Sequence, residues 1–395
     1  SSGSVSWLDD IAKLTHLVEQ GGSRRGAQMI MLADWHPDIV EFIISKMQNP
    51  RILRYLIENT TDESIIRLAK EKLKFKPLSA QEEAMYQSIV NFKNAQGLGD
   101  FNDSIIREAE SKLRDGGTYS VHNPDFLTGA NISVTLTNEF MHAVENDLDF
   151  ELRFPDVANY SPEEMAIYNE EWHKVGDVRE WEKLGHGVRV YRTIKARELW
   201  NLINICATYA AEPGIFFIDN ANEMTNAKAY GQQVVATNPC GEQPLAPYSV
   251  CNLAAVNLAQ FAIKDSKTVD YDALRETVKV GVRMQDNVID ATPYFLEENK
   301  TQALGERRVG LGVMGLADLL IYCEKEYGSE EGNELVDEIF KTIAIAAYEA
   351  SIELGQERGS FPFLQGETAA ETARLREAFV NTGFMKKMPQ HVRDG

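Results

Sequence analysis

One cysteine of this chain stands among residues that can do chemistry together. The segment is Asn238-Pro239-Cys240-Gly241-Glu242, which follows the apolar run Val234-Val235-Ala236. A proline and a glycine on either side of the cysteine disfavour a continuing helix or strand and predict a tight, exposed turn. At such a tip the thiol can be a nucleophile or a hydrogen-atom carrier, while the carboxylate accepts a proton and the carboxamide orients a hydroxyl. The spacing alone also fits a loop cysteine with incidental neighbours.

The other three cysteines lie in apolar surroundings. Cys251 falls within Tyr248-Ser249-Val250-Cys251-Asn252-Leu253, a setting typical of a buried structural cysteine. Cys206 belongs to an apolar helical stretch, and Cys323 follows the run Leu319-Leu320-Ile321. We therefore expect both of them in the core.

Other catalytic and binding patterns are weak. The seven histidines form no H-x-x-x-H pair and the four cysteines form no C-x-x-C pair, which disfavours a zinc site built from neighbouring ligands. The sequence contains neither the Gly-x-Ser-x-Gly nucleophile elbow of hydrolases nor a Walker phosphate-binding loop, which disfavours a hydrolase and an NTPase. Residues 310–315 read Gly-Leu-Gly-Val-Met-Gly and match the dinucleotide fingerprint, but the charged segment 305–308 stands where that motif needs a buried strand. We interpret 310–315 as a strand with small residues, followed by a helix from Leu316.

Apolar periodicity predicts the elements that would position these residues. A helix carrying Trp7, Ile11, Leu14 and Val18, capped by Ser4 or Ser6, ends at Gly21-Gly22, and further helices are expected near Pro37 and over 197–211, 271–290 and 334–356. Short unalternating apolar runs at 29–32 and 215–218 are typical of buried strands. Such strands between long helices indicate a parallel or mixed sheet covered by helices, hence an α/β fold.

Composition excludes several classes of protein. Of 395 residues, 44% are hydrophobic and no apolar stretch is long enough to span a membrane, so a soluble globular protein without a membrane partner is expected. The net charge of −20 disfavours a nucleic-acid polymer as partner, although small nucleotides held by local groups stay possible. Four cysteines do not form a disulfide scaffold, and we expect a reducing cytoplasm.

Two segments differ in composition from the rest. Residues 48–115 are polar and helix-rich, and residues 155–190 are rich in acids and prolines, so both are expected to be surface insertions on one core. The chain begins Ser1-Ser2-Gly3-Ser4 with no targeting signal, and it ends without a closing helix. We expect an internal piece of a longer protein.

Several segments together carry a resemblance to a known family. The stretch from Asn238 to Leu245, with 248–252 and 257–258, closely resembles the active-site segment of ribonucleotide reductase catalytic chains, and Pro-Cys-Gly-Glu-Gln-Pro-Leu is most similar to the adenosylcobalamin-dependent class II enzymes. Further matching stretches occur in family order at 20–27, 36–39, 195–200, 214–219 and 307–318. The resemblance spans nearly the whole chain and is weakest in the two insertions.

The resemblance implies part of a ten-stranded α/β barrel with a central finger loop that carries the radical cysteine. By this resemblance Cys240 is the thiyl radical that takes the 3′-hydrogen of a ribonucleotide, Glu242 the base for the 3′-hydroxyl, and Asn238 the group that holds the ribose hydroxyls. The radical would come from adenosylcobalamin. Cys251 matches one of two cysteines that supply the reducing equivalents, and its partner would lie outside this chain.

The resemblance also implies regulation and partners. The segment Gln20, Gly21, Gly22, Ser23, Arg24, Arg25, Gly26 and Ala27 matches the family's specificity loop, which connects an effector nucleotide at a dimer interface with the substrate base. A homodimer and a thioredoxin-like or dithiol reductant are expected on the same basis. The alternative for this loop is an ordinary glycine turn that ends a helix, with its arginines exposed to solvent and without a regulatory role.

Three alternatives remain beside the class II reductase. A class I catalytic chain would receive its radical from a separate metal-containing subunit, and a glycyl-radical enzyme would share the barrel. A nucleotide-binding or assembly fragment would carry an incidental cysteine. Both ribonucleoside diphosphates and triphosphates fit the sequence as substrates, and the piece alone is expected to be inactive.

Overall fold

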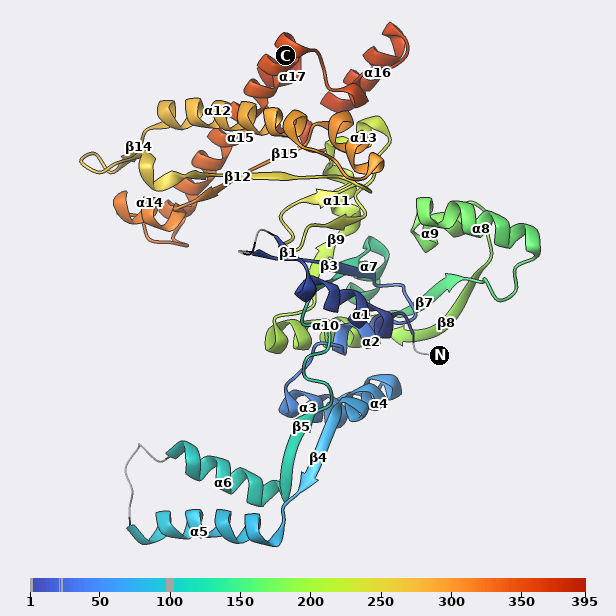
Figure 1. Ribbon diagram of the computed structural model, residues 1–395, viewed down its shortest axis with the longest axis vertical. Helices are drawn as coiled ribbons and strands as arrows, with labels where there is room; N and C mark the ends of the chain where they lie inside the picture. Colours follow the sequence, from blue (N-terminus) through green and yellow to red (C-terminus); the bar gives the residue numbers. More distant parts are fainter. Residues whose placement is uncertain (1–2, 21, 23, 97–102) are drawn as a thin grey trace. The chain divides into compact units, whose positions relative to one another are not determined.

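The computed structural model describes residues 3–20, 22, 24–96 and 103–395 (Figure 1). The chain divides into two compact units, Ser1–Phe217 and Ile218–Gly395, and each contains its own hydrophobic clusters. Within the described residues, no helix combines the length and apolarity needed to cross a bilayer.

The first unit is built on a three-stranded parallel sheet. Its strands are β3 (Met29–Ala33), β6 (Asn131–Leu136) and β9 (Gly214–Phe217), in the order β3-β6-β9. The central strand β6 is buried along nearly its whole length, from Ile132 to Leu136. Strands were predicted at 29–32 and 215–218, and both form. They were also predicted to be buried, but these two outer strands are partly exposed.

Helices connect these strands and make the parallel arrangement possible. Helix α10 (Ala196–Ala210) packs against both α2 (Ile39–Ile44) and α7 (Asn138–Glu145), and all three helices contribute buried residues to the core around β6. The predicted helix over 197–211 is thereby confirmed as α10, and Cys206 is fully buried on it.

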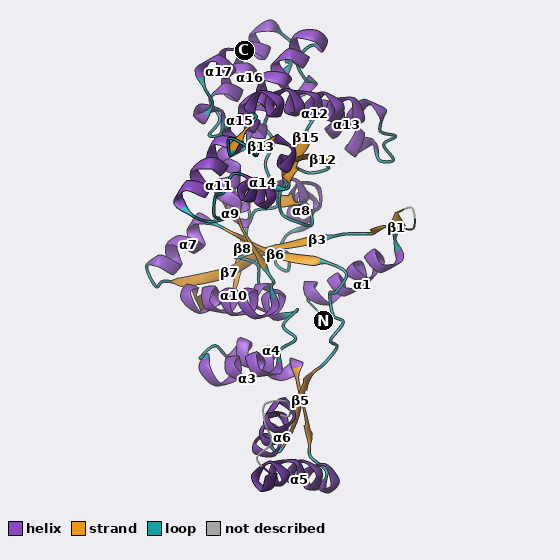
Figure 2. Cartoon of the chain, turned by 90° about the vertical axis from the view of Figure 1, so that its left-hand side faces the viewer, coloured by secondary structure: helices purple, strands orange, loops and turns teal. Residues whose placement is uncertain are grey.

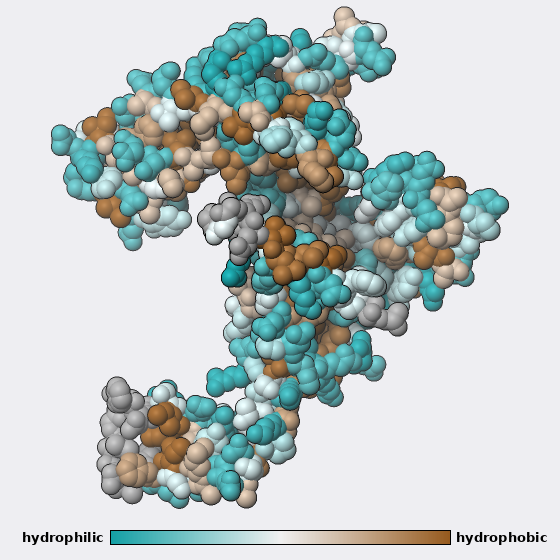
Figure 3. Space-filling view, in the orientation of Figure 1, coloured by the Kyte–Doolittle hydropathy of each residue, from teal (hydrophilic) through white to brown (hydrophobic). Residues whose placement is uncertain are grey.

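Two ribbon-like arms extend from the sheet region of this unit. The first lies after α3 (Pro50–Asn59) and α4 (Glu63–Lys72), and its antiparallel ribbon is β4 (Leu73–Pro77) with β5 (Gly117–Val121). The ribbon carries the helical hairpin α5 (Ala80–Gln96) and α6 (Asp103–Asp115), whose helices lie side by side (Figures 1 and 2). Hydrophobic side chains, among them Met85 and Ile105, are exposed on this hairpin (Figure 3).

The second arm covers most of residues 155–190. Its antiparallel ribbon is β7 (Asp149–Pro155) with β8 (Val188–Lys195), and it carries α8 (Pro162–Val175) and α9 (Val178–Lys183). Trp181 is fully buried there, stacks on His186 at 4.0 Å between ring centroids, and donates its Nε1–H to Tyr160. These aromatic contacts give the arm a packed interior of its own.

The first helix differs from its prediction in two respects. Helix α1 (Ser4–Leu17) has Gly3 at its N-cap without a side-chain cap, because the hydroxyl of Ser4 donates to Asp38 and that of Ser6 to the Gly3 carbonyl. The helix ends at Leu17, before the glycines. The antiparallel pair β1 (Glu19–Gln20) and β2 (Arg24–Arg25) follows, where a loop was expected.

The second unit is built around a pair of parallel strands covered by long helices. Strand β12 (Asn252–Asn257) pairs with β15 (Val309–Met314), and α12 (Tyr271–Ala291), α14 (Leu316–Tyr322) and α15 (Glu330–Arg358) form the core beside them. The predicted helices over 271–290 and 334–356 and the strand at 310–315 are confirmed, and Cys323 is buried as expected.

The remaining elements of this unit are short or peripheral. They are α11 (Ile218–Met224), η2 (Asn226–Tyr230), β10 (Ala236–Thr237), β11 (Pro244–Leu245), η3 (Leu258–Phe261), β13 (Ala262–Ile263), β14 (Thr268–Val269), α13 (Glu297–Glu306), η4 (Pro362–Leu364), α16 (Ala369–Val380), η5 (Met385–Lys387) and α17 (Gln390–Asp394). The α/β class is therefore confirmed, with parallel strands in both units. Within the described residues the strands form open sheets and ribbons rather than a closed barrel.

Candidate active-site hairpin

The segment around Cys240 forms a short hairpin between β10 and β11. The two strands pair antiparallel, with Ala236 opposite Leu245 and Thr237 opposite Pro244. The Val235 amide donates to the Leu245 carbonyl at 2.9 Å and extends the pairing by one residue. Residues 238–243 close the hairpin, so the predicted turn at Cys240 is confirmed.

The tip of the hairpin is organised by Asn238. Its side-chain Oδ1 accepts the amide of Gln243 at 3.0 Å, and its carbonyl accepts the amide of Gly241 at 3.0 Å. Gly241 adopts a φ of +84°, a left-handed conformation that favours glycine over residues with a Cβ. Cys240 and Glu242 are both exposed at this tip. The three predicted residues Asn238, Cys240 and Glu242 are therefore carried by a single turn.

The strand before the hairpin is anchored to helix α11 by one side chain. Asn222 accepts the amide of Val234 at 2.8 Å through Oδ1 and donates through Nδ2 to the Val234 carbonyl at 3.0 Å. This pair of bonds imitates a strand neighbour for Val234, so the entry to the hairpin is held although β10 is only two residues long.

Cys251 lies directly before β12 and is half-buried. Its thiol is 3.5 Å from the Asn252 carbonyl, and a reciprocal pair of hydrogen bonds joins Asn252 to Gln285 of helix α12. Burial raises the pKa of the Cys251 thiol, the charge of Arg308 lowers it, and Glu242 and Glu306 raise it. Because Glu242 acts on this thiol, the hairpin tip and Cys251 share one electrostatic environment.

Strand β15 makes room for Cys251 by means of a glycine. A Cβ on Gly310 would lie 2.4 Å from the Cys251 Sγ and 3.0 Å from the Asn252 carbonyl, whereas a Cβ on Gly312 of the same strand would meet nothing closer than 3.7 Å. The small residues of this glycine-rich segment therefore serve close packing at Gly310, as interpreted from the sequence, rather than a phosphate cradle.

We expect Gly310→Ala to destabilise the second unit by about 1–3 kcal/mol, the usual penalty for overpacking. Gly312→Ala is the matched control, and its effect should stay within about 0.5 kcal/mol. Both substitutions restrict the unfolded chain equally, so that contribution cancels in the comparison. Urea unfolding followed by circular dichroism measures the difference. Equal stability of the two variants would contradict a tight Cys251–Gly310 contact.

Sequence reasoning missed two charged residues beside Cys251. Glu306 ends helix α13 with its side chain almost fully buried, and Arg308 pairs with it through contacts of 3.2 and 3.3 Å. Arg308 also reaches the Pro244 carbonyl of the hairpin at 3.4 Å. The available signal was a pair of charged residues directly before an apolar strand, which indicated that 310–315 is not a dinucleotide site but predicted no contact with Cys251.

The predicted specificity loop lies in the first unit. Gly21 and Ser23, and the side chains of Gln20 and Arg24, lie outside the described residues.

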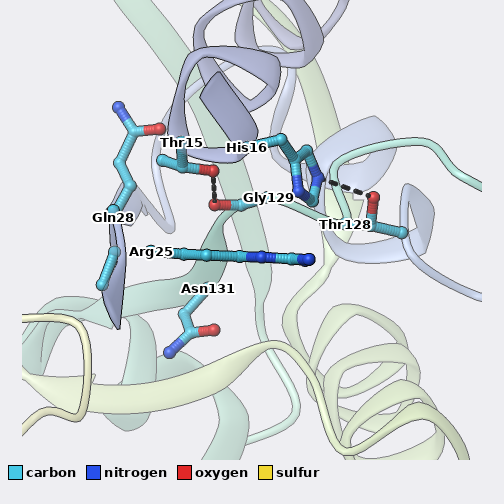
Figure 4. Close-up of a pocket in the computed structure, with 9 residues that line it drawn as sticks. Thr15, His16, Arg25, Gln28, Thr128, Gly129 and Asn131 are labelled. Atoms are coloured by element: carbon cyan, nitrogen blue, oxygen red, sulfur yellow. Dashed lines mark hydrogen bonds between the residues drawn. The ribbon is translucent and has the colours of Figure 1, made fainter. Parts of the chain in front are cut away.

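Arg25 and Gly26 line a pocket of about 290 Å³ together with the end of α1 and the start of β6, and the Arg25 side chain extends along this pocket (Figure 4). Gly26 donates its amide to the Val18 carbonyl at 2.8 Å. The pocket is polar, with Thr15 donating to the Gly129 carbonyl at 2.6 Å and Thr128 within 3.4 Å of His16.

Comparison with known proteins gives one consistent result. The family described as "Ribonucleotide reductase, barrel domain" matches residues 1–390 of the chain. A vitamin B12-dependent ribonucleoside-diphosphate reductase of Thermoplasma acidophilum is 30% identical over 97% of this chain, and one of Mycobacterium tuberculosis is 28% identical over the same share. A ribonucleoside-diphosphate reductase large chain of Cryptosporidium parvum is 34% identical over 59% of this chain. The chain spans 36%, 40% and 28% of the length of these three relatives.

Proposed function

Because this chain belongs to the ribonucleotide reductase barrel-domain family, we propose that it carries the radical-bearing centre of an enzyme that converts ribonucleotides into 2′-deoxyribonucleotides. The observation that carries this proposal is the exposed Cys240 thiol at the tip of a hairpin that also presents Asn238 and Glu242. A thiol destined to react with a substrate must be accessible and held by a defined backbone, and this turn supplies both conditions.

The chemistry assigned to the hairpin solves a specific problem. The 2′-carbon of ribose is unactivated, so a Cys240 thiyl radical first takes the hydrogen atom from C3′ and becomes a thiol. Glu242 takes the proton of the 3′-hydroxyl, and the 2′-hydroxyl gains a proton from a thiol of the reducing pair and leaves as water. Asn238 holds the ribose hydroxyls, which converts an encounter into an oriented attack. In this structure its Oδ1 accepts the Gln243 amide, and both the second lone pair of this oxygen and the Nδ2 donor group can serve a ribose hydroxyl.

Cys251 is proposed as one of two thiols that supply the electrons. In the complete reaction a ribonucleotide and two thiols give a deoxyribonucleotide, a disulfide and water, so atoms and electrons balance. Cys206 and Cys323 are buried in the cores and therefore do not fit the second thiol of that pair. A dithiol or a thioredoxin-like protein would then reduce the disulfide by exchange. All four cysteines are free thiols, which supports a reducing, cytoplasmic setting.

The names of the Thermoplasma and Mycobacterium relatives support adenosylcobalamin as the cofactor. When bound, it supplies the radical that oxidises the Cys240 thiol, through homolysis of its cobalt–carbon bond. The exposure of Cys240 fits such a reagent, since a radical generator outside the hairpin can approach the sulfur. The role of the protein residues is to hold this thiol at a fixed turn and to orient the ribose beside it.

The barrel and the regulatory features belong to the same proposal. We assign the parallel strands β3, β6, β9, β12 and β15 to the ten-stranded barrel of the family, and the β10–β11 hairpin to its finger loop. The pocket beside Arg25 supports a role of the loop from Gln20 to Gly26 in reading an effector or substrate nucleotide.

A homodimer is the proposed assembly. Helix α1 exposes an apolar stripe, with Trp7 67%, Leu14 57% and Leu17 79% exposed, and a second copy of the chain would cover this stripe. Sedimentation of the protein with and without an effector nucleotide tests this assembly, and a monomer under both conditions would contradict it.

The experiment for the overall function follows the radical and the product together. Because the chain spans 36% and 40% of the Thermoplasma and Mycobacterium relatives, it is first joined to the flanking segments that they have. The completed protein is incubated with adenosylcobalamin, a ribonucleotide, an effector nucleotide and a dithiol, and electron paramagnetic resonance detects cob(II)alamin coupled to a thiyl radical. A coupled signal with deoxyribonucleotide formation supports the class II reductase. Product only after addition of a metal-containing subunit would favour a class I chain, the alternative suggested by the similarity to the Cryptosporidium large chain. Absence of product under all these conditions would contradict the proposal.

A further inference from the structure

The register of the second sheet places Arg308 beside Cys251. Strand β12 pairs in parallel with β15, with Asn252 opposite Val309 and each later residue in step. Cys251 and Arg308 are the residues directly before this first pair. Neighbouring strands lie about 4.8 Å apart, so the two residues enter the sheet next to each other. The close approach of the Cys251 sulfur to Gly310 shows that its side chain lies against β15.

Arg308 is held in one position by three acceptors. Its Nε and Nη2 contact the two carboxylate oxygens of Glu306 at 3.3 and 3.2 Å, and its Nη1 reaches the Pro244 carbonyl at 3.4 Å. Pro244 belongs to β11, the strand that leaves the Cys240 turn. One guanidinium therefore connects the hairpin of Cys240 with the strand start of Cys251.

The preceding arginine has a different set of partners. Arg307 adopts a left-handed conformation at the end of α13 and pairs with Asp286 and Asp290 of helix α12. Arg358 of α15 also pairs with Asp286. These pairs hold Arg307 against the helices, whereas the contacts of Arg308 are with Glu306 and with Pro244 of the hairpin.

The charged groups acting on the Cys251 thiol have opposing signs. Burial raises its pKa, Arg308 lowers it, and the carboxylates of Glu242 and Glu306 raise it. Arg308 is thus the cation that opposes the other influences on this thiol. A thiolate, rather than a thiol, is the nucleophile in thiol–disulfide exchange.

We propose that Arg308 is a positioning residue that ties the radical hairpin to the start of β12 and supplies the positive charge beside the Cys251 sulfur. Its value to the enzyme rests on the proposed function, in which Cys251 is oxidised and reduced in each cycle. In that cycle the charge favours the form of Cys251 that leaves or attacks in exchange, and the Pro244 contact holds the Cys240 turn.

The charge is tested by alkylation of Cys251 with iodoacetamide from pH 6 to 10, measured by mass spectrometry. Arg308→Gln should slow alkylation at pH 8 about three- to tenfold, since the rate follows the thiolate fraction. Arg308→Lys should give an intermediate rate, and Glu306→Gln should accelerate alkylation. Arg283→Gln removes the same charge from a residue that pairs with Glu357, and it should leave the rate unchanged.

Two observations distinguish a loosened fold from the charge effect: the direction in which the alkylation rate of Cys251 changes, and the alkylation of a second, buried cysteine. Unfolding would accelerate alkylation in every variant and expose Cys323, which is buried. Opposite shifts for Arg308→Gln and Glu306→Gln, with Cys323 protected, support the proposal. The proposal would be overturned by an unchanged alkylation rate of Cys251 in Arg308→Gln, or by rates that change in the same direction in Arg308→Gln and Glu306→Gln. If Arg308→Gln does not fold, the opposite shifts required of Arg308→Lys and Glu306→Gln decide the question.

The hairpin contact has its own measurement. Hydrogen exchange at the amides of Val235 and Asn238 reports the pairing of the hairpin, because they donate to Leu245 and Gln243. Exchange should be faster in Arg308→Gln and close to wild type in Arg308→Lys, and equal exchange in all proteins would remove this part of the proposal. Alkylation and exchange need neither cofactor nor turnover, so they can succeed or fail independently of the reductase assignment.

Discussion

In the protein completed with the flanking segments of its relatives, Cys240→Ser is expected to abolish detectable deoxyribonucleotide formation, a loss of at least about 10⁴-fold, the scale seen when the reacting group of an enzyme is removed. A hydroxyl has a stronger bond to hydrogen than a thiol, so serine cannot carry the radical. The side chain is exposed at a turn whose shape depends on Asn238 and Gly241, so folding should change by less than about 0.5 kcal/mol. Product formation and the coupled paramagnetic signal are the two measurements, and both should disappear.

Two further cysteine variants make this result specific. Cys323→Ala removes a buried thiol that has no part in the proposed chemistry, and deoxyribonucleotide formation should persist. Cys251→Ser should keep the coupled signal on Cys240 but stop product formation, because a reducing thiol is lost after the radical has formed. If Cys240→Ser retained activity, Cys240 would be an incidental loop cysteine rather than the radical carrier.

The second large effect concerns a buried carboxyl in the first unit. Asp34 follows β3 and is completely buried, its Oδ2 accepts the Thr137 hydroxyl at 2.9 Å and amide at 2.6 Å, and among the described residues its Oδ1 has no hydrogen-bond partner. Burial raises the pKa of Asp34 to about 7, although the hydrogen bonds from Thr137 and the charge of Arg179 lower it. The carboxyl is therefore protonated in the folded protein well above the pH at which the unfolded chain releases this proton.

This shift makes the first unit less stable as the pH rises. Between about pH 4 and pH 7 the folded state binds one proton more than the unfolded state, so the free energy of unfolding falls across this window and levels off above it. The rise from 3.8 to about 7 corresponds to about 4 kcal/mol. Asp34→Asn imitates the protonated acid and should remove this slope. It is expected to be more stable than wild type at pH 8 and slightly less stable at pH 5, where its extra N–H donors lack partners.

The measurement can be confined to the first unit. All five tryptophans lie before residue 218, so tryptophan fluorescence during urea unfolding reports that unit alone. Asp9→Asn is the control. Burial raises the pKa of Asp9, but the Leu127 amide and Lys13 lower it below its usual value overall, so its contribution to stability is lost only as the pH falls below about 4. Parallel pH profiles of wild type and Asp34→Asn between pH 5 and 8 would show that Asp34 is ionised in the fold.

Local sequence patterns predicted the elements whose cause is itself local. The periodic apolar residues of α10, α12 and α15 predicted these helices to within a few residues of their ends. Proline and glycine around Cys240 predicted the turn, because both residues restrict the backbone regardless of what packs around it. The resemblance to a family then connected distant segments that no single pattern joins.

The misjudged features depend on contacts between distant segments. The periodicity of α1 predicted the helix but not the surroundings of Trp7 and Leu14, because these depend on distant segments, and in this structure both side chains are exposed. Ser4 or Ser6 was expected to cap this helix, yet the hydroxyl of Ser4 donates to Asp38, far along the chain, and that of Ser6 donates to the Gly3 carbonyl.

The sequence by itself determined the helices, the turn that presents Cys240, and the side-chain types at its tip, because backbone preference and apolar periodicity act over a few residues. Only the tertiary structure decided the environment of Cys251, where the parallel register of β12 and β15 brings Gly310 against the sulfur and places Arg308 next to Cys251 at the start of the two strands. It also decided the burial of Asp34, which follows from the packing around β3 and β6. Burial and charge at a site are sums over neighbours that are distant in sequence, so they follow from how strands pair and helices cover them.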